Sequence, residues 1–202
     1  MPVQRIKPPK QSFAKLGKAL HHHISLKNKY KSWMKFLPFP VAAKQISFPH
    51  PLYSVRLTEL LRGKSLREVI RRTGWIYFLR DRKNNLALAE VSSIRGAHGN
   101  ARLTEGPFVK KAFALISKSS RDPRLGRHRF ELRSIRVESL HFFCLWFRVA
   151  GGIEYFVPVT SLGTTLQAKR WGSRAELADA LLLEAQRLRD AYARADRLSR
   201  KV

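Results

Sequence analysis

The chain has 202 residues, of which 40 are lysine or arginine and 14 are aspartate or glutamate, so its formal net charge is +26 at pH 7. This length suits one domain with an extension better than two full domains. A hydrophobic fraction of 44% supports a sizeable core and argues against wholesale disorder. A hydrophobic core does not require this excess of positive charge. The excess causes self-repulsion within the folded protein, which a polyanionic partner would relieve, so we expect such a partner.

Several classes of protein are excluded or disfavoured by composition. Cys144 is the only cysteine, which excludes an internal disulfide and any zinc site built from several cysteines. No apolar run reaches the roughly 18 residues that span a bilayer, and the N-terminus has no apolar region typical of a secretory signal. We expect an intracellular, cytoplasmic protein. The acid-free basic N-terminus also resembles a mitochondrial transit peptide, which leaves the matrix as an alternative.

The first part of the chain, residues 1–49, is predicted to be a basic N-terminal arm in front of a single domain at 50–202. No acidic residue occurs before Glu59, and prolines punctuate the segment up to the boundary near Pro49. A short amphipathic helix is expected because one helical face carries Phe13, Leu16, Leu20 and Ile24. After it comes a basic segment with aromatic residues, in which phosphate binding and base stacking are expected of Lys27, Lys29, Lys31, Trp33 and Lys35.

The body is predicted to alternate strands and helices. Strands are expected at 52–57, 75–80, 86–91, 130–137, 140–149 and 153–159, and helices at 66–73, 107–117 and 174–198. Capping boxes begin the first and the last of these helices, at Ser65–Glu68 and Ser173–Glu176. Gly74 is expected to end the first helix, and the stretch between 92 and 106 to be a loop. A tight turn is expected at Gly151-Gly152, and a bulge near Ser134.

These elements predict an α+β fold with a mainly antiparallel sheet of five or six strands, packed with helices, and a long C-terminal helix. Within it, six arginines crowd into sixteen residues and are expected to bind phosphates, namely Arg121, Arg124, Arg127, Arg129, Arg133 and Arg136. A strand would present Arg127 and Arg129 on the face away from the core, and Arg133 and Arg136 are expected to rejoin that face after the bulge near Ser134. The alternative is a solvated strand face in a generally basic protein.

Catalytic and metal-binding patterns are weak. The chain has no nucleophile elbow, P-loop or dinucleotide-binding glycine motif, so we expect no cofactor and no metal. His141 and Cys144 have the spacing of opposite faces of a strand, and Cys144 is expected to be an inert buried thiol. Glu90 lies in an apolar run, where it is expected either to face inward and pair with an arginine or to be exposed.

The leading hypothesis is a non-catalytic polyanion-binding protein that binds nucleic acid or belongs to a ribonucleoprotein or nucleoprotein assembly. One alternative is an adaptor that uses the basic amphipathic arm to contact an anionic membrane or an acidic protein partner. A second alternative is an enzyme whose site is assembled from distant residues and is not visible in the sequence.

Overall fold

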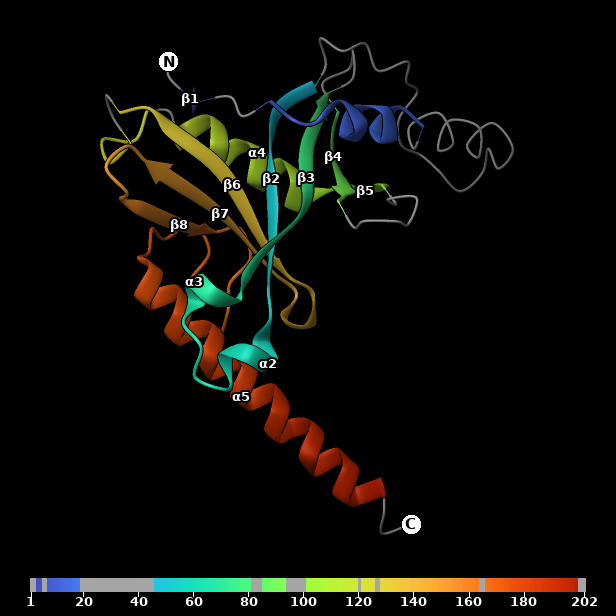
Figure 1. The fold of residues 1–202 in the computed structure, drawn as a ribbon, viewed down its shortest axis with the longest axis vertical. Coiled ribbons are helices and arrows are strands. Elements are labelled where there is room, and N and C mark those ends of the chain that lie inside the picture. Colours follow the sequence, from blue (N-terminus) through green and yellow to red (C-terminus); the bar gives the residue numbers. More distant parts are fainter. Residues whose placement is uncertain are drawn as a thin grey trace.

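A computed structural model describes residues 3–4, 7–18, 46–80, 85–93, 101–119, 121–125, 128–163 and 166–199. Its centre is an eight-stranded sheet with helices packed on both faces (Figure 1). The strands are β1 (Val3–Gln4), β2 (Ile46–Val55), β3 (Ile70–Arg80), β4 (Leu86–Ser92), β5 (Ala101–Glu105), β6 (Phe130–Val137), β7 (Phe142–Val149) and β8 (Glu154–Pro158). The helices are α2 (Leu57–Leu60), α3 (Leu66–Val69), α4 (Pro107–Ser119), the 3₁₀ turn η2 (Glu138–Leu140) and α5 (Arg174–Ser199).

Two antiparallel meanders, β2 to β5 and β6 to β8, make up most of the sheet. They join through a parallel pairing of β2 with β6, in which Leu52 lies opposite Ser134, so the strand order is β5-β4-β3-β2-β6-β7-β8. The short β1 lies outside this order and runs parallel to β6. The predicted α+β class is thus confirmed, whereas the sheet is mixed and has more strands than the five or six antiparallel ones expected. The parallel pairing escaped prediction because it joins segments that are remote in sequence.

Both faces of the sheet are covered. On one face, called the α4 face, α4 packs through Val109, Ala112 and Ile116 onto side chains of β3, β4, β6 and β7. On the other, called the α5 face, α2, α3 and the first half of α5 cover β6 to β8 (Figure 1). Because both faces carry apolar side chains, β7 is buried along nearly its whole length, as predicted for a central strand.

The helix starts follow the predicted capping chemistry. The backbone N–H of Ser65 donates to Glu68 Oε2 at 2.9 Å, and that of Ser173 to Glu176 Oε2 at 2.7 Å. The first of these helices is wrong in length, because α3 ends at Val69 and β3 begins at Ile70. Gly74 is therefore not a helix stop but a strand residue, and a Cβ at this position would lie 2.3 Å from the carbonyl oxygen of Val91.

Three further strand predictions need correction. β2 occupies 46–55 rather than 52–57, and the supposed loop after β4 contains the edge strand β5. No bulge interrupts β6, whose pairing with β7 runs without a shift from Phe130 to Val137. The apparent slip in its alternation arises because Ile135 is buried on the α5 face, while Ser134 is buried on the α4 face with its Oγ 2.8 Å from His50 Nε2.

The N-terminal segment packs on the sheet where it is described. Residues 10–18 are helical, and Leu16 is 1% exposed in a cluster with Trp75 and Tyr77 on the α5 face. Ser12 Oγ lies 2.6 Å from the Tyr77 hydroxyl oxygen. The boundary expected near Pro49 falls inside β2, and the division into arm and body stays a prediction. Residues 19–45, with the rest of the expected amphipathic face, lie outside the described part.

Helix α5 has two dissimilar halves. Leu177 and Leu181 are fully buried against the α5 face. Beyond Ala185 the helix projects from the body (Figure 1), and Tyr192 in this second half is 70% exposed. Among the described helices, α5 included, none is long and apolar enough to cross a membrane.

Candidate functional site

The predicted arginine cluster is divided between different parts of the structure. Arg121 and Arg124 lie between α4 and β6, and Arg129 directly precedes β6. Arg133 points to the α5 face and Arg136 to the α4 face, because β6 alternates without a bulge. The expectation that these two share one face is therefore wrong. Arg127 and the lysine-rich segment with Lys27, Lys29, Lys31, Trp33 and Lys35 lie outside the described residues.

Three members of the cluster, Arg124, Arg133 and Arg136, form ion pairs within the protein. Arg133 forms a bidentate pair with Glu131, with both N–O distances at 2.7 Å, and its guanidinium carbon lies 4.5 Å from the ring centre of Trp146. Arg124 pairs with Asp122 at 3.2 Å and lies 4.7 Å over the ring of Trp171. A stacked, bidentate arginine such as Arg133 holds its position firmly.

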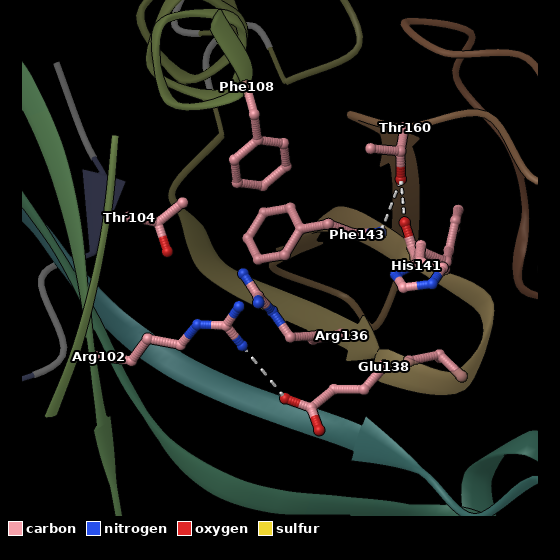
Figure 2. Close-up of a pocket in the computed structure, with 10 residues that line it drawn as sticks. Arg102, Thr104, Phe108, Arg136, Glu138, His141, Phe143 and Thr160 are labelled. Atoms are coloured by element: carbon pink, nitrogen blue, oxygen red, sulfur yellow. Dashed lines mark hydrogen bonds and ion pairs between the residues drawn. The ribbon is translucent and has the colours of Figure 1, made fainter. Parts of the chain in front are cut away.

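A cleft on the α4 face brings together a different set of side chains (Figure 2). It consists of two adjoining hollows of about 400 and 450 Å³ that share Arg102, Arg136, Val137 and Glu138. β5 supplies Arg102, β6 supplies Arg136, and η2 supplies Glu138, so residues from both meanders meet here. The size of each hollow is that of a pocket for a small organic ligand.

One half of the cleft is aromatic. Phe108 of α4 and Phe143 of β7 meet edge to face with ring centres 5.1 Å apart. The backbone around them is fixed by Thr160, whose hydroxyl accepts from the Phe143 N–H at 2.9 Å and donates to the His141 carbonyl at 3.3 Å (Figure 2). His141 itself lies at the rim in a left-handed conformation with φ 48°. This half offers flat apolar surfaces to a ligand.

The other half is polar. Its walls carry the carboxyl group of Glu90 and the short hydroxyl side chains of Ser54, Thr73, Ser92 and Ser139. Thr73 Oγ1 donates a long hydrogen bond of 3.4 Å to the Leu52 carbonyl. Hydroxyl groups both donate and accept, so this half suits a ligand rich in hydroxyl or phosphate oxygens.

A buried ion pair forms the floor between the halves. Arg136 Nη2 contacts Glu90 Oε1, and the two side chains are only 16% and 11% exposed. The contact lacks the orientation of a hydrogen bond, and Glu90 Oε1 and Arg136 Nε have no hydrogen-bond partner among the described residues. Burial raises the pKa of Glu90, an effect that nearby Arg136 and Arg102 partly oppose. Of the two arrangements expected for Glu90, the structure shows the one in which it faces inward and pairs with an arginine.

A second guanidinium lies above this pair. Arg102 is 65% exposed and contacts Glu138, itself 77% exposed, at 3.7 Å. Burial lowers the pKa of Arg136, and repulsion from Arg102 lowers it further while Glu90 opposes both. The two guanidinium groups thus point into the same space (Figure 2), where an anion between them would relieve their repulsion.

Sequence reasoning missed Arg102 and Glu138 as members of a site. They lie outside the arginine cluster, and no spacing rule links an edge strand to the turn after β6. The only sequence signal in this region was the carboxylate of Glu90 inside an apolar strand, which marks a buried charge that needs a partner.

The remaining titratable groups inside the protein have structural surroundings. His50 is 1% exposed, and its Nδ1 lies 2.6 Å from the Phe48 carbonyl oxygen. Burial lowers the pKa of His50 to about 4, so the ring is neutral at pH 7. Cys144 is fully buried on the α5 face, and burial raises its pKa. Within the described ranges, no group of three or more potential metal ligands occurs.

Comparison of the chain with protein-family models, curated proteins and solved structures gives no match.

Proposed function

We propose that the protein binds nucleic acid through contacts with the phosphate backbone, in a binding role within a nucleoprotein or ribonucleoprotein assembly. The supporting observation is the way in which its few acidic residues are used. Nine of the 14 acidic side chains lie in ion pairs with arginine or lysine. The acids are thus neutralised within the protein, and the positive surplus is left for a partner.

Exposed basic side chains occur on several elements of the body. Arg129, before the start of β6, and Arg148, near the end of β7, line one hollow beside the turn at Gly151 and Gly152. Arg121 lies exposed in the connection between α4 and β6. Both turn glycines have positive φ, at 88° and 86°, which keeps the turn tight. We call Arg121, Arg129 and Arg148 the loop arginines. They are exposed, and they form no ion pair with the described residues.

The apolar face expected for membrane insertion is already engaged where it is described. Leu16 packs against the sheet, and the ring of Phe13 lies 5.3 Å from that of Tyr77. Leu16 is buried in the protein and so is not offered to a bilayer, whereas Phe13 is 40% exposed. This observation favours nucleic acid over a membrane as the polyanion.

The test measures binding of labelled single-stranded and duplex oligonucleotides by fluorescence anisotropy over a range of salt. If phosphates dominate and about six are contacted, the affinity falls roughly a thousandfold between about 50 and 200 mM salt and varies little with sequence. Absence of binding at low salt, or binding that salt does not weaken, contradicts the proposal.

Two triple variants locate the contacts. One reverses the loop arginines, as Arg121→Glu, Arg129→Glu and Arg148→Glu, and the other reverses Arg62, Arg67 and Arg71, which are also exposed but lie around α2 and α3. Both change the net charge by the same amount. A larger loss of affinity in the first variant assigns the contact to the loop arginines. Equal losses mean that the charge acts diffusely over the whole surface.

A further inference from the structure

We propose that the cleft on the α4 face binds one nucleotide unit, with its phosphate between the guanidinium groups of Arg102 and Arg136 and its base in the aromatic half. The choice of a nucleotide as the ligand class rests on the proposed nucleic-acid binding, whereas the site itself follows from the geometry of the cleft. Its three parts match the groups that a nucleotide carries: flat apolar walls for a base, two cations for a phosphate and a set of hydroxyl groups for polar contacts.

The two arginines have complementary properties for holding an anion. Arg136 is fixed in place by Glu90 and by Phe143, whose ring centre lies 5.4 Å from the guanidinium carbon. Arg102 is held only by a loose pair with Glu138 in solvent, and such exposed pairs contribute little to stability. Arg102 is therefore free to turn from Glu138 to a bound phosphate, and the anion removes the repulsion between the two cations.

Two buried polar atoms without a hydrogen bond lie at the same place. Glu90 is 9% exposed, and its Oε1, although in contact with Arg136 Nη2, forms no hydrogen bond with the described residues, nor does Arg136 Nε. A buried polar atom that forms no hydrogen bond destabilises the folded protein. A ligand that brings both a donor and an acceptor satisfies this pair, because Glu90 accepts and Arg136 donates. A ribose hydroxyl beside a phosphate offers this combination.

The aromatic half gives the site its preference for a base. Phe108 is only partly buried, and it shares this hollow with Phe142, Phe143 and Val137. Stacking of a base on an aromatic side chain favours binding and tolerates any base. The site is therefore expected to select for the presence of a base more than for its identity.

The experiment titrates the full chain with adenosine 5′-monophosphate, ribose 5-phosphate and adenosine, with calorimetry for affinity and amide chemical shifts for location. The complete nucleotide is expected to bind at least about tenfold more tightly than either half, since each half loses one of the two contact sets. The shifts are expected at residues of β5, η2 and the start of α4.

Three variants identify the contacts. Arg102→Gln is expected to weaken nucleotide and ribose 5-phosphate binding about tenfold, because a charged hydrogen bond to phosphate is lost. Phe108→Leu weakens nucleotide binding and leaves ribose 5-phosphate unchanged. Arg67→Gln, an equally neutralising change at an exposed position of α3, leaves both affinities unchanged. Arg102 and Phe108 are both outside the buried pair, so these variants are expected to fold.

The proposal is overturned if the nucleotide binds no better than ribose 5-phosphate, or if Arg102→Gln and Arg67→Gln have the same effect. A chain that binds oligonucleotides in a salt-dependent way but shows no binding of the mononucleotide overturns this site alone. A chain that binds the mononucleotide in the cleft but no oligonucleotide overturns the proposed function and leaves the site in place.

Discussion

The buried pair of Glu90 and Arg136 yields the sharpest test of the structure. Replacing Arg136 by methionine keeps a long side chain and removes the cation. The negative charge of the Glu90 carboxylate then lies buried on the α4 face without a neighbouring positive charge. Removal of one member of a buried ion pair costs about 3–5 kcal/mol. For a domain of this size that loss lowers the melting temperature by about 6 to 20 °C.

The loss also depends on pH in a defined direction. Burial already raises the pKa of Glu90, and removal of Arg136 raises it further. The folded state then binds the Glu90 proton at a higher pH than the unfolded state, whose glutamate pKa is about 4.3. The free energy of unfolding of the variant therefore increases, relative to the unchanged protein, as pH falls from 7 toward 5. His50 is present in both proteins, so its own titration cancels in the difference.

Urea unfolding at pH 7 and pH 5 measures these changes. The double variant Glu90→Gln/Arg136→Met is expected to recover most of the stability, because it removes both charges. As a matched control, Arg187→Met breaks a 2.6 Å pair with Glu184 in which the arginine is 57% exposed, and costs at most about 0.5 kcal/mol. The reasoning is refuted if Arg136→Met costs no more than the control, or if its cost is the same at both pH values.

Three further predictions concern stability. Gly74→Ala places a methyl group 2.3 Å from the Val91 carbonyl oxygen, and urea unfolding is expected to show a loss of about 1–3 kcal/mol or more. The control Gly17→Ala, with nothing within 4 Å of its Cβ, is expected to be neutral or stabilising. Comparable losses in the two variants would contradict the pairing of β3 with β4. His50 has its pKa lowered to about 4, so stability is expected to be lost as pH falls from about 6.5 toward 4, and His50→Gln should flatten that part of the pH profile. Leu16→Ala is expected to cost about 2–4 kcal/mol because the side chain is 1% exposed, and a cost near zero in thermal unfolding would show that residues 10–18 do not belong to the core.

Local patterns in the sequence predicted much of the fold. The capping boxes at Ser65 and Ser173 act through contacts three residues apart, and the hairpin of β3 and β4 joins neighbouring segments, so both were visible in the chain order. What escaped prediction was non-local. Gly74 was predicted to end a helix, because the sequence does not show that the backbone of Val91 lies against it. β5 was missed because it is a short edge strand of mixed polarity with no periodic signal.

The candidate site was predictable only in part, for the same reason. Pairing with an arginine was one of two expectations for Glu90, but the identity of that arginine depends on the sheet order, in which β3 and β2 lie between β4 and β6. The density of arginines in sequence suggested a single surface, yet Arg133 and Arg136 lie on opposite faces, because a strand without a bulge alternates its side chains. Sequence proximity thus indicated the wrong grouping, and topology brought Arg102 in from outside it.

The parallel pairing of β2 with β6 has a consequence for biosynthesis. Ribosomes complete the first meander and α4 before β6 exists, so a nascent chain that ends near residue 125 has an unpaired β2 edge. It also holds His50 without Ser134, its hydrogen-bond partner 84 residues later in the chain. Open strand edges are templates for pairing with other chains, and contacts this distant in sequence form late in folding. Translation that stalls between α4 and β6 is therefore expected to yield aggregation-prone fragments. The synthesis of β6 provides the strand that pairs with the free edge of β2.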